Sequence, residues 1–110
     1  MSGWIGVDLD GTLAVYDGWA GPDSIGAPIA PMLERVKRWL AEGREVKIFT
    51  ARASVPEQVA PIERWCLEHV GVVLAVTNVK DFGCIEIWDD CCVQVQPNTG
   101  MPVSELNVSM

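Results

Sequence analysis

One stretch near the start of the chain decides the expected fold: Trp4-Ile5-Gly6-Val7-Asp8-Leu9-Asp10-Gly11-Thr12. Its first four residues are mostly apolar and are followed at once by carboxylates, which is typical of a short buried strand that ends at a polar edge. Residues 12–28 are rich in Gly, Asp and Pro, so we expect a loop there. The chain therefore begins with a strand that delivers Asp8 and Asp10 to one end of a sheet.

Two helices are expected after this loop. Apolar residues recur at helical spacing over 29–40, and Pro31 suits a first helical turn. Ser54-Val55-Pro56-Glu57 has the form of a capping box and predicts a second helix that runs towards Val70. Pro61 lies inside this second helix, so we expect a kink there or a division into two shorter helices.

Further strands are predicted at 45–50, 72–76 and 84–89, and a short fifth strand is indicated at 92–96. Strands that alternate with helices favour a parallel sheet covered on both faces. We therefore expect an α/β protein: a three-layer, Rossmann-like parallel sheet of about five strands, with helices on both faces. The chain is expected to be a single domain over residues 1–110, with a core at about 4–95 and a C-terminal tail at 97–110.

Composition excludes several classes of protein. The formal net charge of −7 argues against a general nucleic-acid-binding surface, which needs a basic patch. No apolar run approaches the ~20 residues that span a bilayer, and the N-terminus lacks the features of a signal peptide. We therefore expect a cytoplasmic protein without a membrane partner. The four cysteines form no CxxC pair and His69 is the single histidine, which disfavours zinc; adjacent Cys91 and Cys92 are expected to be buried in a reduced protein.

Chemically useful side chains follow each predicted strand. In parallel α/β sheets, ligands bind beyond the carboxyl ends of the strands. Acids, hydroxyls and a lysine are therefore expected to converge on one rim. The residues at these strand ends are Asp8, Asp10, Thr50, Arg52, Thr77, Asn78, Lys80, Asp89 and Asp90.

Crowded carboxylates predict a divalent cation. They repel one another, and Mg²⁺ prefers oxygen ligands of this kind. Asp8 and Asp89 are candidate direct ligands, and Asp90 binds directly or through water. A carboxylate can also accept a phosphoryl group, and Asp8 at the strand tip is placed for in-line attack. Asp10 is then the candidate general acid and base, which requires a raised pKa.

Neighbouring residues complete a candidate phosphate site. Gly11 allows a turn, and the amides around Gly11 and Thr12 are candidates to hold phosphate oxygens. Thr50 can donate a hydrogen bond to the transferring group, and Lys80 can balance the charge on Asp8 and the phosphate. Arg52 either contacts phosphate or only pairs with Glu57 on the following helix.

These motifs resemble those of the haloacid dehalogenase-like (HAD) phosphatases. Asp8-Leu9-Asp10-Gly11-Thr12-Leu13 looks like the first motif, Phe49-Thr50-Ala51-Arg52 the second, Lys80 the third and Trp88-Asp89-Asp90 the acidic fourth. The resemblance covers residues 4 to about 95. It implies that Asp8 is the nucleophile, that Asp10 is the general acid/base with its backbone carbonyl on Mg²⁺, and that Asp89 and Asp90 complete the metal site.

The chain departs from that pattern in two places. Only a short segment separates Lys80 from Asp89, so a turn is expected to carry Lys80, and Asn78 or Arg52 are further candidates for the phosphate. No segment is long enough for a cap domain, so the resemblance implies a small capless member with an open pocket. The loop of Tyr16, Asp17, Gly18, Trp19 and Ala20 is the local candidate for leaving-group contact, and its Trp19 and Tyr16 could stack on a base or sugar. A neighbouring subunit in a homo-oligomer could cover the open pocket instead.

Three functions remain open at this point. The first is Mg²⁺-dependent phosphomonoester hydrolysis through an aspartyl phosphate, on a phosphorylated small molecule or on the phosphate end of a larger substrate. The larger substrate could be a nucleic acid, although the net charge of −7 does not favour this. The second is phosphoryl transfer or sensing, although receiver domains place a lone phosphoacceptor after the third strand, where this chain has Ala75-Val76-Thr77. The third is a non-catalytic module on the same fold.

Overall fold

The computed structural model describes residues 3–104 of the chain. Four strands and two α-helices alternate along it, and two short 3₁₀ helices precede the second α-helix. The elements are β1 (Trp4–Val7), α1 (Ala30–Ala41), β2 (Glu45–Phe49), η1 (Ala51–Ser54), η2 (Pro56–Gln58), α2 (Val59–His69), β3 (Ala75–Thr77) and β4 (Cys84–Trp88). The predicted α/β class is confirmed.

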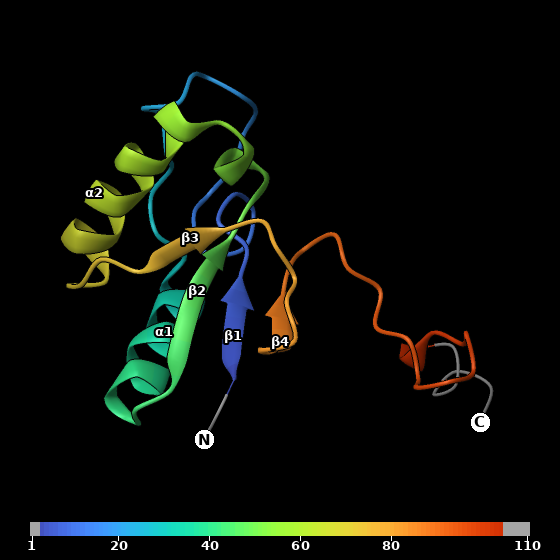
Figure 1. Cartoon of the computed structure of the whole chain (residues 1–110). Helices are drawn as coiled ribbons and strands as arrows, with labels where there is room; N and C mark the ends of the chain where they lie inside the picture. Colours follow the sequence, from blue (N-terminus) through green and yellow to red (C-terminus); the bar gives the residue numbers. More distant parts are fainter. Residues whose placement is uncertain (1–2, 105–110) are drawn as a thin grey trace.

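The sheet has the order β3-β2-β1-β4, and all neighbouring strands are parallel (Figure 1). β1 lies inside the sheet, between β2 and β4, and all four of its residues are buried. Its register pairs Val7 with Ile48 on one side and with Trp88 on the other. The carboxyl ends of β1, β2 and β4 therefore meet at one edge, as the sequence predicts.

Both α-helices lie on one face of this sheet, so the protein has two layers. Val46 and Ile48 of β2 share a buried cluster with residues from α1 and α2, whereas Lys47 and Phe49 point to the opposite face. On that face Lys47 stacks over the Trp4 ring at 4.6 Å. The expected third layer is absent from the described residues because residues 78–83, between β3 and β4, are too few for a covering helix.

This short crossover covers part of the open face. The Nε1–H of Trp4 donates a hydrogen bond to Asp81 at 2.8 Å, and the Trp4 amide donates to the Gly83 carbonyl at 2.7 Å. Trp4 is only 3% exposed as a result. The hydrogen bond donated by the Trp4 indole lowers the pKa of the Asp81 carboxyl, so Asp81 accepts this bond as a carboxylate near neutral pH.

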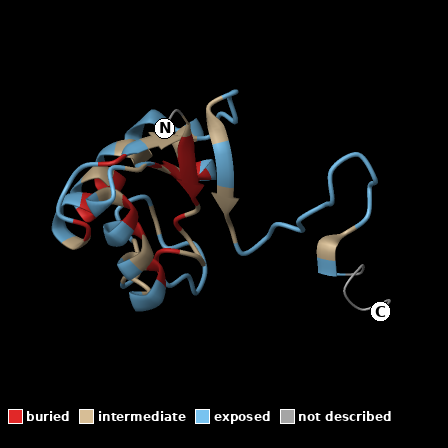
Figure 2. Cartoon of the chain, turned by 90° about the horizontal axis from the view of Figure 1, so that it is seen from below, coloured by how far each residue is buried: buried red, intermediate tan, exposed pale blue. Residues whose placement is uncertain are grey.

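The predicted fifth strand at Cys92–Gln96 does not form within the described residues. After β4 the chain leaves the sheet as an arm, residues 91–104, in which Val95 and Pro102 form an isolated bridge (Figures 1 and 2). The radius of gyration is 15.0 Å, above the about 13 Å of a compact domain of this length. Cys91 and Cys92 lie at the base of this arm and are exposed, so the expectation that they are buried is wrong.

The second helix begins later than predicted. Ser54 does not cap a helix; its hydroxyl donates to the Ala51 carbonyl at 2.7 Å, inside η1. A separate turn, η2, then precedes α2, which begins at Val59 and carries Pro61 in its first turn, where no intrahelical donor is needed. The expected division into two shorter helices is therefore present, but it precedes Pro61.

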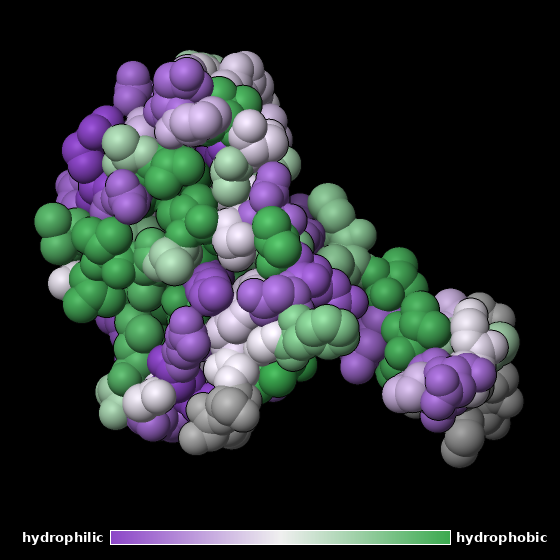
Figure 3. Space-filling view, in the orientation of Figure 1, coloured by the Kyte–Doolittle hydropathy of each residue, from purple (hydrophilic) through white to green (hydrophobic). Residues whose placement is uncertain are grey.

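Exposed apolar residues lie at several places on the surface, and two of these places are visible in Figure 3. One is the segment between α2 and β3, where Val72 and Val73 are about half exposed; the other is the arm, with Val93 and Val95. None of the helices within residues 3–104 combines the length and the apolar character that crossing a membrane requires. The last six residues of the predicted tail, 105–110, lie outside the described part of the chain.

Candidate functional site

Asp8 lies at the carboxyl end of β1, next to the end of β4. Its backbone amide donates to the Trp88 carbonyl at 2.9 Å, which places Asp8 beside Asp89 and Asp90. Trp88 is itself held in place, because its ring packs against Trp39 of α1 at 5.3 Å between centroids. The core of the protein thus fixes the strand end that carries the acidic pair.

The three carboxylates of Asp8, Asp89 and Asp90 form an acidic cluster. Burial, together with hydrogen bonding to Asp90 and the negative charges of Asp89 and Asp90, raises the pKa of Asp8 to about 7. The same contact with Asp8 lowers the pKa of Asp90. Among residues 3–104, no Lys, Arg or His forms an ion pair with any of the three. Oxygen ligands without a counter-charge suit a hard divalent cation such as Mg²⁺.

Gly11 and Thr12 hold Asp90 against the first loop. The Thr12 hydroxyl accepts a hydrogen bond from the Asp90 amide at 3.0 Å and lies 3.2 Å from the carboxylate oxygen to which it can donate. Gly11 adopts a φ of +89°, and a Cβ at this position would lie 2.6 Å from Oδ2 of Asp90. Gly11 is therefore needed both for its backbone conformation and for the space that Asp90 fills.

The amides of this loop are arranged differently from the prediction. The Gly11 amide donates to the Ala14 carbonyl at 2.8 Å, and the Thr12 amide donates to the Leu9 carbonyl at 3.3 Å. Both donors predicted to hold phosphate oxygens are thus engaged within the loop. What Gly11 and Thr12 do instead is position Asp90.

Asp10 points away from the acidic cluster and binds Arg52. The guanidinium donates to both carboxylate oxygens, from Nε at 2.8 Å and from Nη2 at 2.9 Å. This pair is well shielded from water, since Arg52 is 5% exposed and the Asp10 side chain 21% exposed. Of the four residues predicted as metal ligands, Asp90 contacts Asp8 and has a carboxylate oxygen within 4.8 Å of one of Asp89, whereas the Asp10 carboxylate binds Arg52.

Arg52 also fastens the loop after the first motif. It donates to the carbonyls of Pro22 at 3.3 Å and Ser24 at 3.0 Å, and its guanidinium stacks over the Trp19 ring at 4.8 Å. The sequence predicted that Arg52 either contacts phosphate or pairs with Glu57. In the structure Arg52 pairs with Asp10, which lies 42 positions away in the sequence.

Thr50 and Lys80 have very different surroundings. Thr50 is buried, at 4% exposure, and as the N-cap residue of η1 its hydroxyl accepts a hydrogen bond from the Arg52 amide at 3.2 Å. Lys80 is exposed on the crossover and lines a cavity of about 1080 Å³ with Asp89 and the length of β4. Within residues 3–104 it forms no ion pair with an acid, so Lys80 is the predicted site residue that the structure leaves most isolated.

Cys91 is the nearest soft ligand to the acidic cluster. Its Sγ and one carboxylate oxygen each of Asp89 and Asp90 lie within 4.8 Å of one another. The negative charge of Asp90 raises the pKa of the Cys91 thiol. Carboxylates outnumber the single thiol at this place, and a donor set of mostly oxygen atoms suits Mg²⁺ better than zinc.

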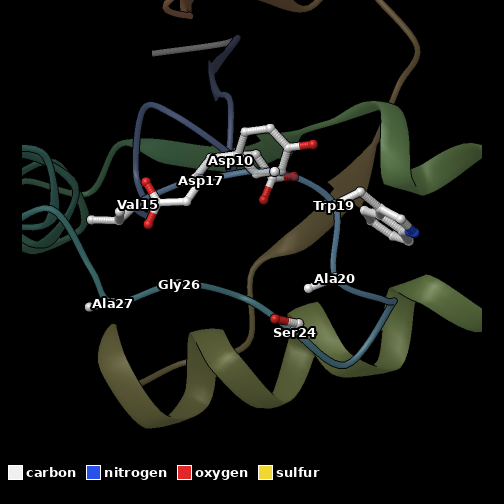
Figure 4. Close-up of a pocket in the computed structure, with 10 residues that line it drawn as sticks. Asp10, Val15, Asp17, Trp19, Ala20, Ser24, Gly26 and Ala27 are labelled. Carbon is white, nitrogen blue, oxygen red and sulfur yellow. The ribbon is translucent and has the colours of Figure 1, made fainter.

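A second cavity lies beside Asp10, within the loop of residues 15–27. Its volume is about 560 Å³, and Figure 4 shows Asp10 and Asp17 on one side of it, with Ser24, Gly26 and Ala27 opposite. Asp17 lines this cavity together with Tyr16 and Trp19, and all three belong to the loop that the sequence indicated for leaving-group contact.

The base of this loop is closed by several bonds. The Val15 amide donates to the Ala27 carbonyl at 2.9 Å, and the Trp65 indole of α2 donates to the Gly26 carbonyl at 3.0 Å. Together with the bonds from Arg52, these contacts make the cavity a preformed part of the fold.

Comparisons with known proteins found no match to the chain among protein-family models, curated proteins or solved structures.

Proposed function

We propose that the chain is a Mg²⁺-dependent phosphomonoesterase of the HAD type, with Asp8 as the nucleophile. One observation carries this proposal: Asp8, directly after the buried strand β1, contacts Asp90 and lies near Asp89, both directly after β4, and no basic residue of the described chain forms an ion pair with the three. Asp8, Asp89 and Asp90 would hold Mg²⁺, which would offset their charge and that of a bound phosphate. The proposal concerns the chemistry of the site: the described residues form a sheet of four strands with two α-helices, which is smaller than the three-layer fold expected from the sequence.

The proposed reaction has two steps. A carboxylate oxygen of Asp8 attacks phosphorus, the bond from phosphorus to the leaving oxygen breaks, and Asp10 gives that oxygen a proton. Water then attacks the aspartyl phosphate, Asp10 takes the proton from the water, and Asp8 is regenerated with release of inorganic phosphate. Thr50 and Lys80 are the residues proposed to contact the transferring group, with Lys80 reaching it by movement of its exposed side chain.

The Asp10–Arg52 pair bears directly on this mechanism. A carboxylate that accepts two hydrogen bonds from Arg is held in its ionised form, which suits a base and opposes an acid. Substrate binding must therefore loosen the pair before Asp10 can protonate a poor leaving group. Phosphoesters with good leaving groups, which need no proton, should react faster.

The same pair favours one alternative function. If Arg52 stays on Asp10 throughout, the aspartyl phosphate forms but is hydrolysed slowly, and the chain acts as a phosphoryl-transfer or sensing module. The two functions differ in the lifetime of the phosphorylated protein, which is directly measurable.

The test is phosphate release from acetyl phosphate and p-nitrophenyl phosphate in the presence of Mg²⁺. Asp8→Asn should lower kcat/KM by at least about 10³-fold, because an amide cannot accept the phosphoryl group. Asp23→Asn is the matched control, since Asp23 is an exposed acid whose only described ion pair is a surface contact with Arg64. Retained turnover in Asp8→Asn would overturn the mechanism.

Intact-protein mass spectrometry then separates hydrolase from sensor. For a phosphatase, the phosphorylated form is a transient species during turnover and accumulates in Asp10→Asn. For a sensor, it accumulates in the unmodified protein and persists after the phosphodonor is removed.

A further inference from the structure

The cavity beside Asp10 has a lining whose chemistry narrows the substrate. Its ten lining residues include two acids, Asp10 and Asp17, and two aromatic residues, Tyr16 and Trp19, but no Lys, Arg or His. The volume of about 560 Å³ falls within the usual range for small-molecule sites. Since Asp10 is the proposed proton donor to the leaving oxygen, the leaving group of a bound phosphoester would extend into this cavity.

The charge of the cavity is set by Asp17. Asp10 is neutralised by Arg52, whereas Asp17 forms no ion pair among the described residues. Four of the five guanidinium N–H donors of Arg52 bind Asp10, Pro22 and Ser24, one N–H on Nη1 remains, and Arg52 does not line the cavity. The cavity therefore repels an anionic leaving group and attracts a cation.

The aromatic residues add to this preference. Tyr16 is 47% exposed and Trp19 is 54% exposed, even though Arg52 stacks on the Trp19 ring. Electron-rich ring faces beside a carboxylate are the usual means by which proteins bind ammonium groups. Arg52 already makes such a contact with Trp19, which shows that this ring accepts a cation.

We propose that the cavity formed by Asp17, Tyr16 and Trp19 binds a positively charged amine on the leaving group, so that the substrates are phosphomonoesters of amino alcohols. This proposal rests on the proposed function, because it assigns the leaving group of the same reaction. It disfavours sugar bisphosphates, nucleoside diphosphates and nucleic-acid ends, whose leaving groups carry further negative charge.

The test compares two substrates of nearly equal shape and different charge. Phosphocholine carries a quaternary ammonium group, and 3,3-dimethylbutyl phosphate replaces its nitrogen with carbon. The ratio of their kcat/KM values should be about 10 in favour of phosphocholine, as a carboxylate and two partly exposed rings together imply. Asp17→Asn and Trp19→Ala should each bring the ratio towards 1, whereas Asp23→Asn, on the same loop but outside the cavity lining, should leave it unchanged.

Acetyl phosphate separates failure of the inference from failure of the proposed function. Turnover of acetyl phosphate with a ratio at or below 1, or faster turnover of nucleoside monophosphates than of phosphocholine, would overturn the amino-alcohol assignment alone. A ratio of about 10 that Asp17→Asn does not change would overturn the role of the cavity. Absence of turnover and of protein phosphorylation with every phosphodonor would overturn both proposals.

Discussion

Asp8 and Asp10 lie two residues apart in the same loop, yet their surroundings are opposite. Asp10 binds a buried Arg52 through both oxygens, and the protein supplies its counter-charge. Asp8 faces Asp89 and Asp90, and no described basic residue forms an ion pair with this cluster. The charge of Asp10 is balanced by Arg52 within the fold. The charges of Asp8, Asp89 and Asp90 are not balanced by a described basic residue, so a cation from solution could balance them.

This difference assigns separate tasks to the two carboxylates. A residue whose charge is satisfied holds the loop of residues 15–27 in place, through the further bonds of Arg52 to Pro22 and Ser24. A residue whose charge is unsatisfied is suited to bind a metal ion and to attack phosphorus. Substitutions on each side should therefore have different consequences.

The largest effect on stability is expected on the Asp10 side. Arg52→Gln leaves the Asp10 carboxylate and two loop carbonyls without their donor, which should lower the free energy of unfolding by about 3 kcal/mol. Arg64→Gln is the matched control, because its pair with Asp23 is long, at 3.4 Å, and its side chain is 69% exposed; a loss of at most about 0.5 kcal/mol is expected there. Urea denaturation measures both, and equal losses would contradict the assigned role of Arg52.

A smaller loss is expected where the loop meets Asp90. Gly11→Ala combines a positive φ with a Cβ that would lie 2.6 Å from Asp90, whereas Gly43→Ala has a similar φ of +81° and nothing within 4 Å. Gly43→Ala should cost about 1 kcal/mol, and Gly11→Ala about 1 kcal/mol more, because Asp90 must move. Gly11→Ala should also weaken Mg²⁺ binding, as measured by isothermal titration calorimetry. Identical behaviour of the two variants would show that the space around Asp90 is unimportant.

A third effect is a dependence of stability on pH that belongs to Asp8. Its pKa of about 7 in the folded protein is above the ordinary aspartate value of 3.8, so the folded state holds this proton more tightly than the unfolded chain does. The stabilisation is present below about pH 4 and is lost as the pH rises towards about 7. The midpoint of thermal unfolding without divalent cations should therefore fall over this range by more than it does in Asp8→Asn.

Adding Mg²⁺ should reverse that fall at neutral pH, because the cation replaces the proton on the acidic cluster. Its affinity should decrease below about pH 7, where the proton competes. A pH dependence equal in the two proteins, or one that Mg²⁺ does not alter, would contradict the assignment of the cluster as a metal site.

Local sequence patterns predicted most of the elements. The apolar spacing over 29–40 corresponds to α1, and the apolar stretches at 4–7 and 45–49 form β1 and β2. These predictions succeeded because each pattern is decided by burial of one local face. The convergence of Asp8, Asp89 and Asp90 was also predicted, since parallel strands bring their carboxyl ends together.

Features that depend on distant contacts were missed. The pairing of Asp10 with Arg52 joins two loops, and no local spacing distinguishes it from a pair with Glu57. Cys91 and Cys92 look like core residues by type, but they follow the point where the chain leaves the sheet. Ser54 and Glu57 match a capping box in spacing, yet the tight η1 turn takes the Ser54 hydroxyl for the Ala51 carbonyl.

The placement of β4 has a consequence for the order of folding. β1, α1, β2, α2 and β3 can assemble one after another from near neighbours, whereas β4 must close a loop that reaches back from Cys84 to Trp4. Loop closure over such a span is slow relative to local assembly, so β4 is expected to dock last. A partly folded chain would then contain the complete pair of Asp10 and Arg52 and lack the acidic cluster. The ability to bind a divalent cation would appear only with the final native contacts, which makes it a reporter of complete folding.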